Sequence, residues 1–223
     1  MKTRHKLKML AAAAAVAGVF SAPAQAAPVA LELALLVDVS GSVDATEYNL
    51  QKQGYINAFN DAVIQANITS LTGGIAVTYI EWSGSTQQSV EVPWTLITDA
   101  TSSAAFATAI GGATRNFSGS TAPGSAINYT TPLFSSNAYE GARWVIDVSG
   151  DGEQNDGANT AAARNAFLTA ATGAGASGTI NGLCIGGTSL CNWYQANIVS
   201  AGGFLVQAND FAHFDGAVRA KIG

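Results

Sequence analysis

Three side chains with oxygen atoms, Asp38, Ser40 and Ser42, stand two residues apart at the end of an apolar stretch. A carboxylate and two hydroxyls are hard oxygen donors, which suit Mg²⁺, Mn²⁺ or Ca²⁺ better than zinc. Gly41 lets the backbone turn tightly between the two serines, so that both hydroxyls can converge. The spacing therefore predicts one loop of a site for one of these divalent cations.

The segment that must position this loop is the apolar run over residues 33–37. An unbroken apolar run of this kind is typical of a strand that is buried on both faces of a parallel sheet. Ligands in open α/β sheets bind at the carboxyl ends of the strands. We therefore expect the loop at that edge of a sheet.

Further apolar strands and amphipathic or alanine-rich helices alternate along the rest of the chain. This alternation predicts an α/β fold, namely a doubly wound, mostly parallel six-stranded sheet flanked by helices. The first helix should begin after Asp44, because Glu47 follows it at the spacing of a capping box. Beyond the first strand, the expected strands cover residues 75–82, 87–92, 141–149, 179–185 and 204–208. The expected helices cover residues 44–66, 99–111, a segment starting just after 121, 158–171, 191–200 and the end of the chain from 210.

Two further loops carry polar side chains beside expected elements. Thr121 stands two residues before Pro123, which suits the first turn of a helix. Asp147 and Asp151 lie where another apolar strand runs into an acidic, turn-rich loop that also contains Glu153. If the strands are parallel, Thr121 and the two aspartates lie at the same edge of the sheet as the first loop. We expect Glu153 to lie on a solvated face of its loop.

Together, and in this order, the three loops resemble the metal-ion-dependent adhesion site of the von Willebrand factor type A domain. The resemblance covers residues 31–222, almost the whole chain after its first 26 residues. More narrowly, the chain is similar to an uncharacterised group of exported bacterial proteins that share the turn Ile-Asp-Val-Ser-Gly-Asp-Gly, here residues 146–152. The matching positions are Asp38, Ser40 and Ser42 in the first loop, Thr121 before the Gly124-Ser-Ala-Ile127 helix start in the second, and Asp151-Gly152 in the third.

The resemblance implies a role for each residue. Ser40, Ser42 and Thr121 would bind the ion directly, while Asp38 and Asp151 would supply negative charge directly or through water. An open position on the ion would accept an acidic side chain from a protein or peptide partner. The third loop is longer than the usual Thr-Asp-Gly of the family, so Asp147 remains a rival of Asp151.

The first 26 residues have the pattern of a secretory signal. Four basic residues precede an apolar centre at residues 9–20, and Ala24-Gln25-Ala26 forms a small-x-small cleavage site. We expect cleavage near Ala26, a periplasmic or extracellular location, and a single von Willebrand A-like domain over residues 27–223 without a transmembrane anchor. In an oxidising compartment, Cys184 and Cys191 should form a disulfide bond.

Composition and missing motifs limit the classes of function. Four of the ten Lys and Arg residues precede residue 27 and all 15 Asp and Glu residues follow it, so cleavage changes the formal net charge from −5 to −9. This acidity argues against nucleic-acid binding. The sequence lacks a Gly-x-Ser-x-Gly elbow, and His213 is the one histidine after the leader, so we expect no enzyme. The resemblance implies an exported, divalent-cation-dependent protein-binding module of the adhesion type. A non-catalytic scaffold with a vestigial metal site and a metal-dependent hydrolase remain alternatives to this function.

Overall fold

The computed structural model describes residues 26–222. The signal peptide expected over residues 1–26 lies outside these residues apart from Ala26, and it stays a prediction. The strands are β1 (Ala27–Val29), β2 (Leu31–Asp38), β3 (Ile75–Trp82), β4 (Gln88–Ile97), β5 (Tyr139–Gly141), β6 (Arg143–Gly150), β7 (Ser177–Ile185) and β8 (Leu205–Ala208). The helices are α1 (Ala45–Phe59), α2 (Ala62–Ser70), α3 (Ala100–Gly111), α4 (Pro123–Ser135), α5 (Thr160–Gly173), α6 (Thr188–Asn197), the short 3₁₀ helix η1 (Phe211–His213) and α7 (Phe214–Ile222).

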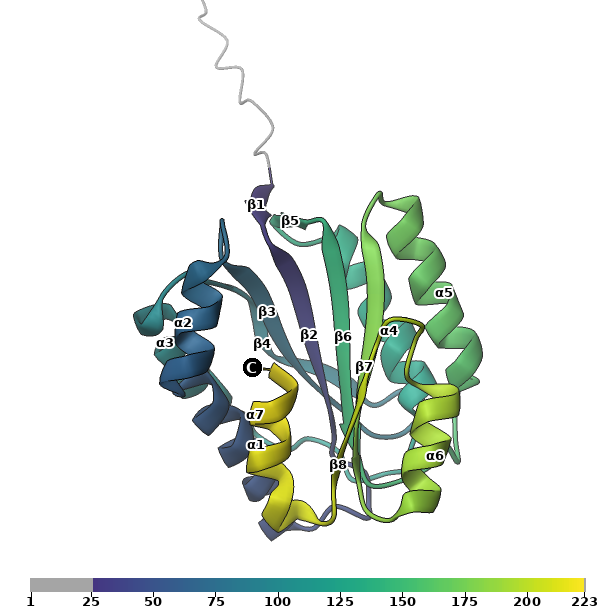
Figure 1. The fold of residues 1–223 in the computed structure, drawn as a ribbon. Helices are drawn as coiled ribbons and strands as arrows, with labels where there is room; N and C mark the ends of the chain where they lie inside the picture. Colours follow the sequence, from purple (N-terminus) through teal and green to yellow (C-terminus); the bar gives the residue numbers. More distant parts are fainter. Residues whose placement is uncertain (1–25, 223) are drawn as a thin grey trace, which may run out of the picture.

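A six-stranded sheet in the order β4-β3-β2-β6-β7-β8 forms the centre of the molecule (Figure 1). Five strands are parallel, and the edge strand β4 runs antiparallel to β3. The predicted fold class, a doubly wound and mostly parallel six-stranded sheet, is therefore confirmed. The carboxyl ends of the parallel strands lie at the lower end of Figure 1, opposite β1.

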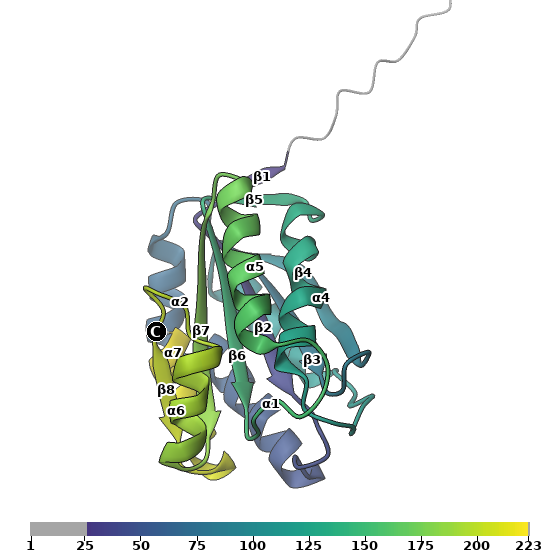
Figure 2. The same ribbon diagram turned by 90° about the vertical axis from the view of Figure 1, so that its right-hand side faces the viewer.

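Helices cover both faces of this sheet. Figure 1 shows α1, α2 and α7 on one side and α4, α5 and α6 on the other, and α5 lies in front of the sheet in Figure 2. On the first face the aromatic rings of Tyr55, Phe59 and Phe106 are fully buried, and on the second face Phe134 stacks on Trp144 with ring centroids 5.1 Å apart. Burial of both faces explains why the central strands are mainly apolar.

The structure corrects three details of the predicted elements. The helix expected over residues 44–66 is broken, because the Asp61 carboxylate accepts the N–H groups of Val63 and Ile64 and caps a second helix. β4 continues beyond residue 92 through Pro93, which an edge strand tolerates since one side of it needs no donor. β1 and β5 form an unforeseen two-stranded parallel sheet.

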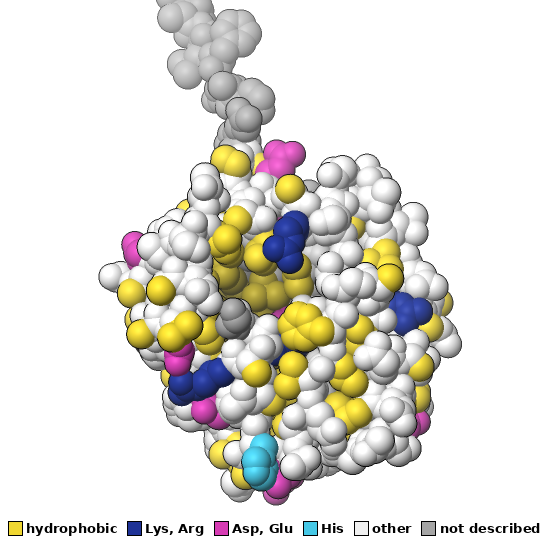
Figure 3. Space-filling view, in the orientation of Figure 1, with side chains coloured by type: hydrophobic (Ala, Val, Ile, Leu, Met, Phe, Trp, Pro, Cys, Tyr) yellow, Lys and Arg dark blue, Asp and Glu magenta, His cyan; other side chains and the backbone are white. Residues whose placement is uncertain are grey.

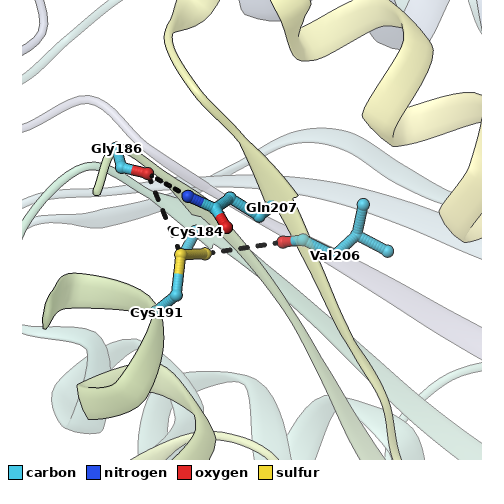
Figure 4. The surroundings of a disulfide bond; sticks show 5 residues. All are labelled: Cys184, Gly186, Cys191, Val206 and Gln207. Carbon is cyan, nitrogen blue, oxygen red and sulfur yellow. Dashed lines mark hydrogen bonds between the residues drawn. A yellow bond between two sulfur atoms is a disulfide. The ribbon is translucent and has the colours of Figure 1, made fainter. Parts of the chain in front are cut away.

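Two local predictions are confirmed. Asp44 accepts the N–H of Glu47 at 2.9 Å, and the Glu47 carboxylate accepts the N–H of Asp44 at 2.8 Å, which completes the capping box of α1. Cys184 at the end of β7 and Cys191 on α6 form the expected disulfide bond, with their Cα atoms 5.3 Å apart (Figure 4). The bond ties α6 to the sheet.

No helix within residues 26–222 is long and apolar enough to cross a bilayer.

Candidate metal centre

The first loop leaves the sheet at Asp38, the last residue of β2, whose side chain is fully buried. Asp38 Oδ1 accepts the backbone N–H of Ser40 at 2.8 Å, so the loop folds back over the carboxylate. Gln51 of α1 donates to the Asp38 carbonyl oxygen at 2.9 Å. The Arg115 guanidinium donates to the carbonyl oxygens of Val39 and Ser40 at 3.0 and 2.8 Å. These contacts hold the loop from both sides.

The predicted hydroxyls and the third loop meet in one chain of contacts. The Oγ atoms of Ser40 and Ser42 lie 3.2 Å apart, and Ser42 Oγ donates to Asp151 Oδ1 at 2.7 Å. Ser42 and Asp151 are 109 residues apart in the sequence. The end of β6, next to β2 in the sheet, brings Asp151 to this position. Parallel pairing of β2 with β6 thus joins the first and third loops.

Thr121 reaches the same place from the loop before α4. Its backbone N–H donates to Asn155 Oδ1 at 2.8 Å, and its carbonyl oxygen accepts the Asn155 N–H at 3.0 Å. A Cβ atom at Gly152 would lie 3.3 Å from Thr121 Oγ1, so the Thr121 hydroxyl packs directly against the third loop. The structure therefore places all five predicted residues at one end of the sheet.

Asp147, the rival of Asp151, does not join this group. It lies in the middle of β6, opposite Leu35, where its Oδ1 accepts a hydrogen bond from Asn181 at 2.8 Å and its Oδ2 lies 3.7 Å from Lys221 Nζ. Its side chain lines a largely hydrophobic hollow of about 360 Å³ between α2, α7 and the sheet, which is open in Figure 3. The strand runs on to Gly150, so Asp151 is the first acidic residue beyond its end.

The electrostatics of the cluster favour a cation. Burial, and secondarily the charge of Asp151, raises the pKa of Asp38 from 3.8 to about 7. Asp38 Oδ2 is buried and has no hydrogen-bond partner within residues 26–222. A buried carboxylate oxygen without a partner is costly unless a positive charge or a donor reaches it.

The donor set fits a hard divalent ion. Three hydroxyls and two carboxylates are the oxygen ligands that Mg²⁺, Mn²⁺ and Ca²⁺ accept. Within residues 26–222, no group of three or more His, Cys, Asp or Glu side chains is arranged to hold a metal ion. The residues present therefore fit the predicted ion.

Four residues around the centre were not foreseen from the sequence: Gln51, Arg115, Asn155 and Tyr194. The first three hold the loops through side-chain contacts with backbone groups. Tyr194 of α6 is fully buried, and its hydroxyl lies beside Gly150 and Asp38. No spacing rule links these residues to the loops, because each contact joins segments that only the fold brings together.

The fold is that of a von Willebrand factor type A domain, as comparison with solved structures shows. Proximal thread matrix protein 1 from the mussel byssus, in a structure with a zinc-occupied MIDAS motif, is 13% identical, with a TM-score of 0.64 over 89% of this chain and 48% of that one. The von Willebrand factor type A protein from Catenulispora acidiphila is 17% identical, with a TM-score of 0.58 over 86% of this chain and 41% of that one. The pilus adhesin SpaC from Lactobacillus rhamnosus GG is 13% identical, with a TM-score of 0.60 over 86% of this chain and 30% of that one.

The chain itself belongs to the family described as "Protein of unknown function (DUF1194)", whose model matches residues 28–223. No curated protein matches it. The chain spans about half the length of the mussel protein and less of the other two.

Proposed function

We propose that this protein is an exported, non-catalytic, divalent-cation-dependent protein-binding module. Ser40, Ser42 and Thr121 hold the ion through their hydroxyl oxygens, and Asp38 and Asp151 supply the negative charge. Mg²⁺ is the expected ion, with Mn²⁺ and Ca²⁺ as substitutes.

The observation that carries this proposal is the convergence of three loops at the carboxyl edge of the sheet. Ser42 and Asp151 are in hydrogen-bond contact at 2.7 Å, although 109 residues separate them. The unpartnered Oδ2 of Asp38 lies in the same region. Helix capping explains a single serine or threonine near a helix start, but it does not explain a set of five oxygen-bearing side chains from three loops.

A protein partner follows from the chemistry of the ligands. Ions held mainly by neutral hydroxyls keep much of their positive charge, so an open coordination position attracts a carboxylate. We therefore propose a protein or peptide partner that presents an acidic side chain to the ion. The zinc-occupied MIDAS motif of the mussel matrix protein and the pilus adhesin among the structural neighbours support an interaction role on this fold.

Calorimetric titration with Mg²⁺ and Mn²⁺ tests the ion. Wild-type protein should bind one ion, and Thr121→Ala should bind it more weakly by tenfold or more, because a direct oxygen ligand is lost. Glu153→Gln is the matched control: Glu153 is exposed, lies two residues from Asp151 and has no polar partner within residues 26–222, so its loss should leave the affinity unchanged. A folded wild-type protein that binds no ion would favour the scaffold with a vestigial site.

Capture of partners tests the carboxylate. Immobilised wild-type protein should retain proteins from an envelope extract with Mg²⁺ and release them with a chelator. Amidation of the carboxyl groups of the retained proteins should prevent their rebinding. Retention that survives chelation, or amidation, would contradict an ion-bridged partner. Turnover of phosphoester or ester substrates by the ion-loaded protein would favour the hydrolase instead.

A further inference from the structure

Tyr194 carries a buried hydroxyl for which the proposed function gives no role. The side chain is fully buried on α6, and its oxygen has no hydrogen-bond partner within residues 26–222. Buried tyrosine hydroxyls normally find a partner, since an unmade hydrogen bond in a dry environment is unfavourable. An unpaired phenol beside a candidate metal centre therefore calls for an explanation.

The position of Gly150 shows how near this hydroxyl is to Asp38. A Cβ atom at Gly150 would lie 2.5 Å from the Tyr194 hydroxyl oxygen and 2.7 Å from Asp38 Oδ2. The two oxygens are thus separated by no more than the sum of these distances. Any side chain at position 150 would occupy the space that both of them face, which is why glycine is required there.

The two unpaired groups are chemically complementary. A phenol donates one hydrogen bond, and a carboxylate oxygen accepts. Asp38 Oδ1 already accepts the Ser40 N–H, whereas Oδ2 has no partner in the described chain. The buried Tyr194 hydroxyl faces the same space beside Gly150 as this second oxygen.

The fold holds Tyr194 firmly in this place. Cys191 lies three residues earlier on the same buried face of α6, and its disulfide partner Cys184 pairs with Gly150 across the β6–β7 ladder. After the helix, the N–H groups of Ile198 and Val199 donate to the Tyr194 carbonyl oxygen at 2.8 and 3.0 Å. The disulfide and these hydrogen bonds restrict both ends of the segment.

We propose that Tyr194 is a positioning residue of the metal centre. Its hydroxyl donates to Asp38 Oδ2 through one water molecule, and so fixes the orientation of the carboxylate toward the ion. The inference rests on the proposed function, because it concerns the same ion. Groups that orient metal-facing carboxylates in this way typically contribute 10- to 100-fold in metal affinity.

The test is Tyr194→Phe, which keeps the ring and removes the hydroxyl. Its Mg²⁺ dissociation constant, measured by calorimetry, should be 10- to 100-fold higher than that of the wild type. Tyr79→Phe is the matched control. The Tyr79 hydroxyl on β3 is also buried without a partner in the described chain. The Tyr79 ring packs against Tyr55, and none of the contacts of the metal centre described above involves it. Loss of the Tyr79 hydroxyl should therefore leave Mg²⁺ affinity unchanged.

A double-mutant cycle with Asp38→Asn tests whether the two side chains interact, while the Mg²⁺ affinity of Tyr194→Phe tests the positioning role. The free energies of unfolding of the two single variants and the double variant are measured in chelator, where no ion is needed. We expect them to be non-additive, because the two side chains interact. Additive values would overturn the inference, and so would equal Mg²⁺ affinity in wild type and Tyr194→Phe. A wild type that binds no Mg²⁺ would overturn the proposed function and this inference with it.

Discussion

Replacing Asp38 with asparagine should stabilise the ion-free protein at alkaline pH. The asparagine side chain would keep an oxygen for the Ser40 N–H, which Asp38 Oδ1 accepts at 2.8 Å, and the substitution would remove the buried charge. Burial raises the pKa of Asp38 from 3.8 to about 7. A difference of about three pKa units corresponds to roughly 4 kcal/mol between the two protonation states.

The sign follows from proton linkage. Because the pKa is higher in the folded protein, the folded state binds the proton more tightly than the unfolded chain does. The stabilisation of the fold by the proton on Asp38 is complete below pH 3.8 and is lost as the pH rises through about 7. At pH 8 the ionised Asp38 therefore destabilises the ion-free fold by up to roughly 4 kcal/mol, and at pH 5 by roughly 2–3 kcal/mol less.

Urea unfolding of both proteins in chelator, followed by tryptophan fluorescence, measures this difference. Asp38→Asn should be the more stable protein at pH 8, and its advantage should shrink by roughly 2–3 kcal/mol at pH 5. Other groups with a raised pKa, such as Glu81, are common to both proteins and cancel. Saturating Mg²⁺ should reverse the order at pH 8, because only the wild type keeps the full charge that binds the ion. A difference that is the same at both pH values would refute the reasoning.

Three further predictions concern the loops, the disulfide and the leader. Thr121→Val keeps the shape of the side chain without its hydroxyl, so the Mg²⁺ affinity measured by calorimetry should fall at least tenfold. The far-ultraviolet circular dichroism spectrum should stay unchanged. An unchanged Mg²⁺ affinity would remove Thr121 from the ligands. Replacing Cys184 and Cys191 by alanine should lower the free energy of unfolding by roughly 2–3 kcal/mol, as expected for a short closed loop, and equal urea midpoints would contradict this. Mass spectrometry of the exported protein should show a chain beginning at Ala27, and an intact Met1 would exclude cleavage.

The elements of the fold were largely predictable because their signals are local. The apolar run before Asp38 and the capping pair Asp44 and Glu47 act within a few residues. The break at Asp61 was missed, since the apolar residues on both sides of it keep helical spacing. The pairing of β1 with β5 was missed because it joins residues more than 100 positions apart.

The candidate site was predictable in its residue types but not in its surroundings. The spacing of Asp38, Ser40 and Ser42 marks the first loop, and a strand end marks Asp151. The sequence does not decide between Asp147 and Asp151, because the third loop is longer than the Thr-Asp-Gly of the family that it resembles. In the structure, Asp147 faces Lys221, a contact between a strand and the last helix that no local pattern reveals. The same holds for Tyr194, whose relation to Asp38 depends on the docking of α6.

Crystals grown with Mn²⁺ and measured at the manganese absorption edge test the central claim most directly. We predict one anomalous peak at the carboxyl edge of the sheet, about 2.0–2.6 Å from the hydroxyl oxygens of Ser40, Ser42 and Thr121, with Asp38 and Asp151 beside it. No peak there, or a peak on the loop around Glu153 instead, would contradict the account.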